Sequence, residues 1–176
     1  MKKQDILENQ VNLVYLALGS NLGDKKNNLN TIIDLIQKEG ILIKKRSKFY
    51  STKSWPNENF PSFINSIILI ETKLNIIELF LIIKKIEKKL GRTKSIRNYP
   101  RVCDIDIIDY NGEIIHRKLG NHILNIPHKR MQNRNFVLFP LYELDKDWVH
   151  PKLNKNIVIL MSNLTSDQLL GIKIAQ

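Results

Sequence analysis

Two acidic residues, Asp104 and Asp106, are separated by a single residue in the apolar run R-V-C-D-I-D-I-I-D-Y. Because side chains alternate along a strand, both carboxylates point to one face, while Cys103, Ile105 and Ile107 point to the other. Two like charges at this spacing disfavour each other unless a cation intervenes. Paired carboxylates are usual ligands of Mg²⁺, together with phosphate oxygens and water. The pattern predicts a metal site, and a solvated edge-strand face is the alternative.

The third acid of the run, Asp109, falls on the opposite face by the same alternation. It lies beside Asn111-Gly112, a residue pair that strongly favours a tight hairpin turn. We therefore predict that Asp109 is solvated. We also predict that the turn joins a strand over 104–110 to a second strand over 113–116.

A basic segment, L-G-R-T-K-S-I-R-N-Y-P-R, immediately precedes the paired acids. Its cations are Arg92, Lys94, Arg97 and Arg101. Gly91 and Pro100 interrupt this basic segment and favour a loop over a helix face. Guanidinium groups bind phosphate oxygens through paired hydrogen bonds. In isolation the segment would be a solvated basic loop, but beside two carboxylates it indicates polyphosphate binding and phosphoryl transfer.

Two further segments contain residues that could bind a substrate. The stretch I-P-H-K-R-M-Q-N-R-N-F places His128, Arg134 and Phe136 near the start of a predicted helix, where anions are favoured. The stretch F-P-S-F-I-N places Phe63 and Asn65 on one strand face, where a ring and an amide can hold a flat heterocycle. From these residues alone, a structural His128 and a core Phe63 are the favoured alternatives.

Hydrophobic periodicity and capping residues predict an order strand–helix–strand–strand–helix–strand, with elements over 11–19, 24–37, 41–50, 63–73, 75–90 and 104–110. A polar loop is predicted over 51–61, and a third helix over 133–144, which Pro140 must kink or split. The order predicts an α+β, ferredoxin-like fold, an antiparallel sheet with two helices packed on one face. A C-terminal hairpin strand and short helices are expected to follow.

The chain has 176 residues, of which 43% are hydrophobic, and a formal net charge of +11. These values suit a single domain over 1–176, with a polar leader over 1–10 and a tail over 151–176 that receives no role. The charge would attract polyanions, although a drift toward Lys, Ile and Asn explains it equally well. One cysteine excludes an intramolecular disulfide, and no run reaches the ~18 apolar residues of a membrane span. We expect a cytoplasmic protein.

Several segments, in this order, resemble the 6-hydroxymethyl-7,8-dihydropterin pyrophosphokinase family of folate synthesis. They are L-A-L-G-S-N-L-G-D, F-Y-S-T, F-I-N, P-R-V-C-D-I-D-I-I and I-P-H-K-R-M-Q-N-R-N-F-V-L-F-P-L-Y-E-L, within residues 14–150. The resemblance implies a ferredoxin-like fold and transfer of diphosphate from ATP to a reduced pterin alcohol, with release of AMP. It also implies ATP as co-substrate and two Mg²⁺ ions bound by Asp104 and Asp106.

The same resemblance implies roles for individual residues. The predicted catalytic residues are Arg92, Arg101, Asp104 and Asp106. The predicted ATP-binding residues are Glu87, Lys94, Arg97, Ile107, His128 and Arg134. The predicted pterin-binding residues are Thr52, Phe63, Asn65 and Phe136. The two phenylalanine rings are expected to sandwich the pterin.

Two alternative functions stay open from the sequence. A ferredoxin-like RNA-binding module would suit the charge, but it requires an aromatic-rich strand that this chain lacks. A phosphotransferase with a different acceptor is opposed only by Phe63, Asn65 and Phe136. We expect small-molecule substrates, no nucleic-acid or membrane partner, a monomer, and association with neighbouring folate enzymes.

Overall fold

The computed structural model describes residues 11–55, 57–92 and 99–176. The strands are β1 (Asn12–Ser20), β2 (Leu42–Arg46), β3 (Tyr50–Thr52), β4 (Phe63–Thr72), β5 (Asp104–Tyr110), β6 (Ile115–Leu119), β7 (His122–Ile126), β8 (Val149–His150), β9 (Lys155–Asn156) and β10 (Ile172–Ile174). The helices are α2 (Lys25–Lys38), α3 (Ile76–Lys89), a 3₁₀ helix (Met131–Asn133), α4 (Asn135–Leu144), α5 (Ile157–Ser162) and α6 (Ser166–Leu170). The predicted leader over 1–10 lies outside the described residues.

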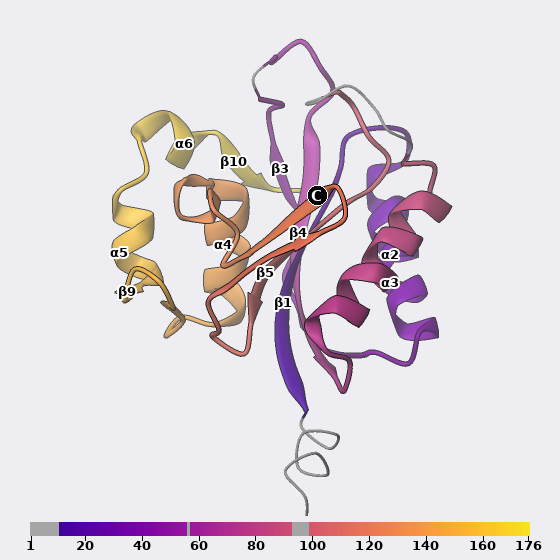
Figure 1. The fold of residues 1–176 in the computed structure, drawn as a ribbon. Helices are drawn as coiled ribbons and strands as arrows, with labels where there is room; N and C mark the ends of the chain where they lie inside the picture. The colour runs from indigo at the N-terminus through magenta and orange to yellow at the C-terminus, as the bar shows by residue number, and fades with distance from the viewer. Residues whose placement is uncertain (1–10, 56, 93–98) are drawn as a thin grey trace, which may run out of the picture.

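A central antiparallel sheet separates two helical layers, with α2 and α3 on one side and α4, α5 and α6 on the other (Figure 1). The sheet has the order β10–β3–β4–β1–β5, and β2 also pairs with β4. When β2 and β3 are counted as one strand, the four predicted strands stand in the order second, third, first, fourth. This is the ferredoxin-like arrangement, and the predicted fold class is confirmed. Within the described residues, no helix is long and apolar enough to cross a membrane.

Helices α2 and α3 begin at the predicted capping residues. The Asp24 carboxylate accepts a hydrogen bond from the Asn27 N–H at the start of α2. The Asn75 side chain accepts from the Glu78 N–H, and the Glu78 carboxylate accepts from the Asn75 N–H, which completes a capping box. These hydrogen bonds join residues three positions apart, so the sequence alone determines where both helices begin.

The second helical layer covers the other face of the sheet. Ile67 of β4 and Ile108 of β5 pack there against Leu138 of α4 and Ile157 of α5. Because both faces are covered, β1 and β4 are buried along most of their length. The tail over 151–176, which received no role from the sequence, supplies α5, α6 and the edge strand β10.

The predicted continuous strand over 41–50 is wrong at 47–49, where the chain leaves the sheet after β2 before it returns as β3. The Ser47 N–H donates to the Ile67 carbonyl at 2.9 Å, and the Ser47 hydroxyl accepts from the Ile67 N–H at 3.0 Å. One polar residue therefore satisfies the backbone of β4 where the neighbouring strand breaks. The loop predicted over 51–61 starts later, because Ser51 and Thr52 belong to β3.

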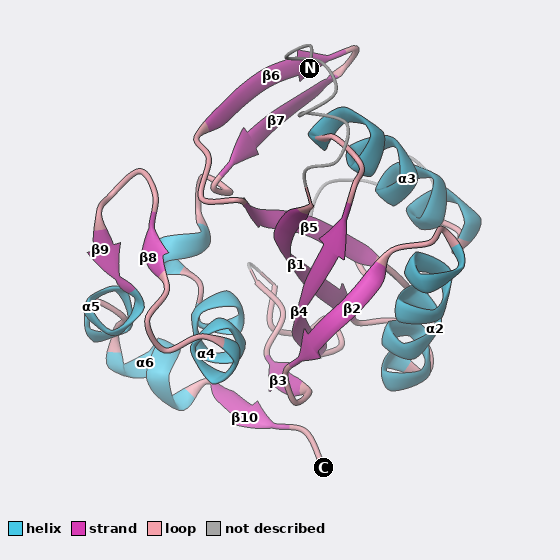
Figure 2. Cartoon of the chain, turned by 90° about the horizontal axis from the view of Figure 1, so that it is seen from below, coloured by secondary structure: helices cyan, strands magenta, loops and turns pink. Residues whose placement is uncertain are grey.

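The Asn111-Gly112 turn forms as predicted, but the strand after it pairs elsewhere. Both residues adopt positive φ, 53° and 69°. The predicted pairing of 113–116 with β5 is wrong, because β6 pairs with β7 in a separate two-stranded sheet, here called the β6–β7 ribbon. Figure 2 shows this ribbon standing apart from the main sheet. The turn is a local property, whereas the choice of partner depends on contacts made later in the chain.

The third predicted helix is close to the observed one, except at Pro140. A short 3₁₀ helix precedes α4, and α4 continues through Pro140 without a break. Of the two expected effects of Pro140, a kink or a split, the split does not occur. Arg134 occupies the residue before the first turn of α4.

A β-bulge in β5 changes which residues face each side. Leu16 of β1 pairs with Ile107, but Tyr15 pairs with Asp109, so Ile108 is the extra residue. Strict alternation holds up to Ile108, which packs in the core on the α4 side, opposite to Ile107. Asp109 then faces the same layer as Ile108 instead of the opposite one.

Asp109 is therefore not the solvated residue on the opposite face that the sequence predicts. It is 3% exposed, and its carboxylate accepts from the Trp148 indole at 2.9 Å and from the Gly112 N–H at 2.7 Å. Burial raises the pKa of Asp109 above its usual value. Two hydrogen bonds compensate a buried carboxylate that anchors the β8 region to the end of β5.

Candidate active site

The paired acids lie where β1, β4 and β5 run side by side. Gly19 of β1 pairs with Asp104 of β5 on one side and with Asn65 of β4 on the other. A Cβ at Gly19 would lie 3.2 Å from Asn65 Oδ1 and 3.8 Å from Asp104 Cβ. The missing side chain lets a predicted metal ligand and a predicted pterin ligand approach the buried backbone of β1 from its two sides.

Two arginines flank Asp104. Arg92 Nη1 lies 2.6 Å from one carboxylate oxygen, and Arg101 Nη1 lies 3.3 Å from the other. Arg92 follows the end of α3, and Arg101 precedes β5, so the two guanidinium groups approach from different segments. The structure thus brings together three of the four predicted catalytic residues.

Glu87 of α3 holds Arg92 in this position. Its side chain is 4% exposed, and its carboxylate accepts from Lys84 Nζ at 2.7 Å and from the Ile105 N–H at 3.0 Å, besides pairing with Arg92. A buried carboxylate with three donors is firmly oriented. Glu87 thereby joins α3 to β5 directly beside the paired acids. Its contact with ATP stays a prediction.

Asp106 faces a second set of basic groups. Arg134 Nη1 lies 3.6 Å from Asp106 Oδ2, and His128 Nε2 lies 3.9 Å from the same oxygen. Crowding by surrounding protein atoms, together with the charge of Asp104, raises the pKa of Asp106 to about 6. The side chain nevertheless keeps 37% of its surface exposed. A carboxylate that is disfavoured in its charged form, yet open to solvent, is suited to receive a cation.

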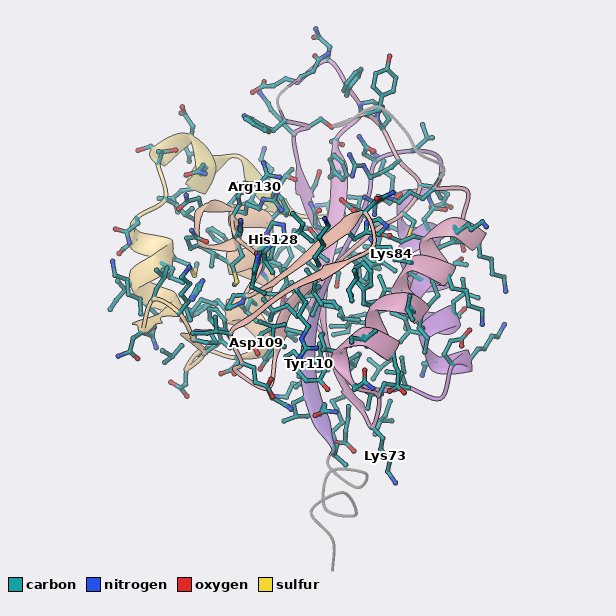
Figure 3. All side chains as sticks on the ribbon, in the orientation of Figure 1. Lys73, Lys84, Asp109, Tyr110, His128 and Arg130 are labelled. Carbon is teal, nitrogen blue, oxygen red and sulfur yellow. The ribbon has the colours of Figure 1, made fainter. Side chains whose placement is uncertain are left out.

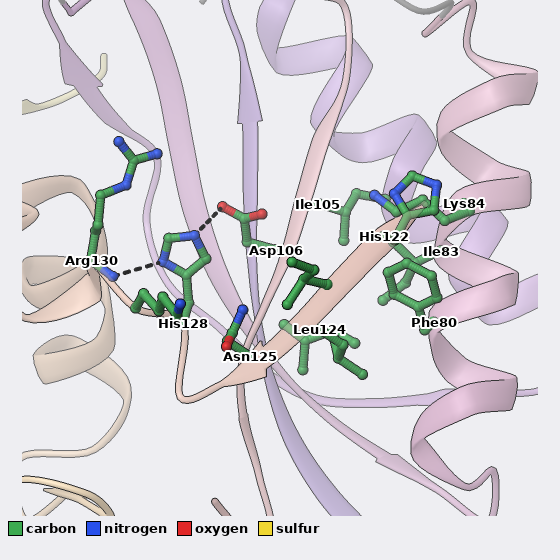
Figure 4. Close-up of a pocket in the computed structure, with 13 residues that line it drawn as sticks. Phe80, Ile83, Lys84, Ile105, Asp106, His122, Leu124, Asn125, His128 and Arg130 are labelled. Atoms are coloured by element: carbon green, nitrogen blue, oxygen red, sulfur yellow. Dashed lines mark hydrogen bonds and ion pairs between the residues drawn. The ribbon is translucent and has the colours of Figure 1, made fainter. Parts of the chain in front are cut away.

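His128 is a neutral imidazole at physiological pH. Burial, followed by the charges of Arg134 and Arg130, lowers its pKa to about 4. Its Nδ1 accepts a hydrogen bond from the Arg130 N–H at 3.3 Å, so Nε2 carries the proton. Figure 4 shows this nitrogen directed at Asp106. His128 can therefore donate a hydrogen bond into the site without adding charge.

The lowered pKa of His128 predicts a specific pH dependence of stability. Between pH 6.5 and about 4 the unfolded chain binds a proton that the folded protein does not. As pH falls through this window, wild type should therefore lose on the order of 2 kcal/mol more stability than His128→Gln, in which His150 and Asp106 still titrate. Urea unfolding of both proteins near neutral pH and near the lower end of the window measures the difference. Parallel pH profiles would contradict the prediction.

The predicted pterin residues lie on two neighbouring strands and on α4. Asn65 Nδ2 donates to Thr52 Oγ1 at 3.0 Å, and Phe63 pairs with Thr52 between β4 and β3. Phe136 lies in the first turn of α4, with the Arg134 guanidinium 5.3 Å from its ring centroid. The strands thus gather Thr52, Phe63 and Asn65, while Phe136 comes from the other helical layer.

A cavity of about 570 Å³ opens between α3, β5 and the β6–β7 ribbon. Its lining residues are Phe80, Ile83, Lys84, Ile105, Asp106, Ile107, His122, Ile123, Leu124, Asn125, His128, Lys129 and Arg130. Figure 4 shows Asp106 and His128 on one side of it and Phe80, Lys84 and His122 on the other. In the whole molecule, His128 and Arg130 lie on the α4 side of the sheet and Lys84 on the α3 side (Figure 3). The volume suits a small organic ligand.

Two predicted ATP-binding residues lie outside the described part of the chain, and two residues that contact the site were not identified from the sequence. Lys94 and Arg97 lie outside the described residues, whereas Ile107 is buried and lines the cavity. Sequence reasoning missed Lys84, although its position three residues before Glu87 places both on one helix face. It also assigned no role to Asn21, whose side-chain partners are distant in sequence.

The side chains that could bind a metal ion at this site offer oxygen atoms, which are the ligands that Mg²⁺ prefers. Within 11–55, 57–92 and 99–176, no group of three or more His, Cys, Asp or Glu side chains could hold a metal ion. Asp104 and Asp106 offer two carboxylate groups as metal ligands. Proteins commonly bind Mg²⁺ through one or two carboxylates, with phosphate oxygens and waters as the other ligands. The residues present therefore fit Mg²⁺ brought in with a phosphate substrate.

The sequence profile of the family described as 7,8-dihydro-6-hydroxymethylpterin-pyrophosphokinase matches residues 15–146. The 2-amino-4-hydroxy-6-hydroxymethyldihydropteridine pyrophosphokinase of Aquifex aeolicus is 40% identical over 144 residues, which cover 81% of this chain and 86% of that protein. The protein of the same name from Bacillus subtilis is 39% identical over 134 residues, 76% of this chain and 78% of that protein.

Other similar proteins are longer. The mitochondrial folate synthesis bifunctional protein of Pisum sativum is 39% identical over 138 residues, 78% of this chain but 26% of that protein. A crystal structure of a Plasmodium falciparum HPPK-DHPS variant with pterin and p-hydroxybenzoate has a TM-score of 0.76 at 16% identity, covering 97% of this chain and 49% of that chain. The chain thus spans about a quarter and about half of these two proteins. At this identity, the structural likeness concerns the fold.

Proposed function

The chain belongs to the 7,8-dihydro-6-hydroxymethylpterin-pyrophosphokinase family, and we propose that it transfers diphosphate from ATP to 6-hydroxymethyl-7,8-dihydropterin at the site around Asp104 and Asp106. The reaction is a pyrophosphoryl transfer of folate biosynthesis and leaves AMP. The observation that supports this site is the pair of acids on one strand face, flanked by basic groups and separated from the Asn65 amide by Gly19. Such a site can accept a polyphosphate beside a flat polar ring.

On the phosphate side, the cationic side chains neutralise charge. The hydroxymethyl oxygen forms a bond to the β-phosphorus of ATP and gives up its proton to water, while the bond from that phosphorus to the AMP oxygen breaks. Negative charge grows on the leaving AMP and spreads over the transferring group. Arg92 and Arg101 on one flank and Arg134 on the other stabilise this charge. The Nε2–H of His128 adds a hydrogen bond.

We propose that Asp104 and Asp106 hold the predicted pair of Mg²⁺ ions together with phosphate oxygens. The bound metal would neutralise phosphate charge and fix the geometry of the triphosphate. Arg92 and Arg101 would then exchange their contacts with Asp104 for contacts with phosphate oxygens. The raised pKa of Asp106 supports this proposal, because a nearby cation relieves the cost of ionising the carboxyl group.

On the pterin side, the Asn65 side chain would form hydrogen bonds with the polar edge of the pterin ring. Its Nδ2 donates to Thr52 Oγ1, and its Oδ1 lies on the Gly19 side, 3.2 Å from where a Cβ of Gly19 would stand. An amide oxygen in this place can accept hydrogen bonds from pterin N–H groups. Phe63 and Phe136 would supply aromatic surfaces for stacking. The pterin hydroxymethyl group would then lie on the Asp104 side of Gly19.

Gly19→Ala is expected to raise the KM for the pterin about tenfold while leaving the fold intact. The new methyl group would lie 3.2 Å from Asn65 Oδ1 and 3.7 Å from Phe63 Cδ1, so the amide must shift away from its present position. A tenfold effect corresponds to about 1.4 kcal/mol of lost binding. Steady-state kinetics with both substrates and a thermal melt measure the effect. An unchanged KM for the pterin would show that Asn65 does not read the ring.

The proposed function has a direct test. Incubating the protein with ATP, Mg²⁺ and 6-hydroxymethyl-7,8-dihydropterin should produce AMP and the pterin diphosphate in equal amounts. Omitting the pterin, or chelating the metal, should prevent AMP formation. Formation of ADP, or no nucleotide product at all, would overturn the proposal. The same assay separates a diphosphate transferase from the RNA-binding alternative, which predicts no turnover.

A further inference from the structure

Asn21 joins three segments that are distant in sequence. It directly follows β1 and is 1% exposed. Its Nδ2 donates to Ser54 Oγ and to the Pro61 carbonyl, each at 3.2 Å, and its Oδ1 accepts from the Arg101 N–H at 2.7 Å. The Asn21 N–H also donates to the Arg101 carbonyl at 3.0 Å. One buried amide therefore binds the β3–β4 connection and the start of β5 at the same time.

The Asn21 amide contacts the connection at its base. Ser54 Oγ donates to the Pro61 carbonyl at 2.6 Å, which closes segment 54–61 at its two ends. Thr52 and Phe63, proposed to contact the pterin, lie two residues outside these ends and pair with each other. Displacing the base of the segment would therefore displace the pterin side of the site.

The phosphate side depends on the same amide through Arg101. The backbone of Arg101 exchanges two hydrogen bonds with Asn21, while its guanidinium reaches Asp104. A second contact links the two segments, because the rings of Phe60 and Tyr99 lie 5.5 Å apart. The Tyr99 carbonyl in turn accepts from Arg101 Nε at 3.3 Å.

We propose that Asn21 is a positioning residue for diphosphate transfer, which holds Ser54, Pro61 and the Arg101 backbone together so that the pterin and phosphate sides of the site assemble as one unit. This inference rests on the proposed function. Only an amide side chain supplies both the two donors for Ser54 and Pro61 and the acceptor for Arg101. Asn21→Asp keeps the acceptor but loses both donors, and Asn21→Ala loses all three bonds.

Asn12 provides a matched control at the other end of β1. It is 8% exposed, its Nδ2 donates to the Leu74 carbonyl at 3.1 Å, and its Oδ1 accepts from Asn111 Nδ2 at 2.7 Å. It is thus a buried asparagine at the opposite end of β1 from Asn21, and it also bridges two connections. None of its partners belongs to the proposed site. Asn12→Ala therefore reports the structural effect of removing such a residue.

The experiment compares wild type, Asn21→Ala, Asn21→Asp, Ser54→Ala and Asn12→Ala. It measures kcat, both KM values, urea unfolding, and the Kd of a methylene analogue of ATP that cannot transfer diphosphate. Asn21→Ala should lower kcat/KM for the pterin about a hundredfold and weaken analogue binding about tenfold, because small displacements of positioning groups have effects of this size. Asn12→Ala should stay within about twofold of wild type in both at a comparable loss of stability.

Asn21→Asp and Ser54→Ala separate effects on pterin binding from effects on nucleotide binding. Asn21→Asp and Ser54→Ala leave the acceptor for the Arg101 N–H in place, so both should raise the KM for the pterin more than the Kd of the analogue. Ser54→Ala, which removes only one hydroxyl and introduces no buried charge, also tests the inference should Asn21→Ala fail to fold. Equal loss of affinity for both substrates in Ser54→Ala would overturn the idea that this hydroxyl acts on the pterin side.

The possible failures can be told apart. If Asn21→Ala and Asn12→Ala show the same kinetics at the same stability, the positioning role is wrong and the proposed function stands. If wild type releases no AMP, the proposed function is wrong. In that case the Kd values of the methylene analogue of ATP test the inference without any measurement of activity. A loss of affinity confined to the Asn21 variants supports a coupled site, and equal affinities overturn it.

Discussion

In Asp106→Asn, AMP release should fall about a thousandfold, a barrier increase of about 4 kcal/mol, without loss of folding stability. Asparagine keeps the size of the side chain but removes the charge that the proposed Mg²⁺ site requires. Because the pKa of Asp106 is raised to about 6, ionising this carboxyl group costs more free energy in the folded protein than in the unfolded chain. Removing that charge should leave stability equal or higher. Steady-state AMP assays and urea unfolding measure both quantities.

Asp109→Asn, three residues farther along the same strand, is the control for Asp106→Asn and should lower stability while activity is nearly unchanged. Asp109 binds Trp148 and Gly112 and faces the α4 layer beyond the bulge. Its replacement should lower the free energy of unfolding by about 1 to 2 kcal/mol and leave kcat within about twofold. Asp106→Asn with more than a tenth of the wild-type rate would remove Asp106 from the proposed metal site.

In Arg92→Ala, kcat should fall on the order of a hundredfold, with a loss of stability of about 1 to 3 kcal/mol. Arg92 contacts both Asp104 and the buried Glu87. Its removal takes a cation from the phosphate side and leaves the Glu87 carboxylate with two donors instead of three. Arg92→Lys should be intermediate, because one ammonium group does not reproduce the geometry of a guanidinium fork.

Lys85→Ala is the matched control for Arg92→Ala. Lys85 also belongs to the α3 region, but it pairs with Glu39 at 2.9 Å on the exposed side of the helix. The variant removes the same amount of positive charge, so it reports how far net charge alone attracts ATP. Stability should change by less than about 1 kcal/mol and kcat should not change. A comparable loss of kcat in both variants would assign the effect to overall charge instead of to the position of Arg92.

Local hydrogen bonding made much of the fold predictable. Asp24 and Asn75 cap α2 and α3 through residues three positions away, so helix starts follow directly from sequence. Asp104 and Arg101 are also three residues apart, and Arg92 lies nearby on the segment before them. A short sequence separation brings these groups into one region almost regardless of the rest of the fold. Their grouping was therefore predictable, although their roles stay predictions.

Tertiary pairing decided what the sequence pattern could not. The bulge at Ile108 breaks the alternation on which the position of Asp109 was predicted, because β1 sets the register of β5 from far along the chain. The same holds for β6, whose own residues do not reveal that it pairs with β7.

The sequence by itself determined the order of the elements, the helix starts and the short-range cluster of acids and arginines. Only the tertiary structure placed Gly19 between Asp104 and Asn65, and Asn21 between Ser54 and Arg101. Both arrangements join segments separated by more than thirty residues. The residues next to a position in the sequence determine its backbone preference and whether it is buried. They do not determine which distant groups the register of the sheet brings into contact with it.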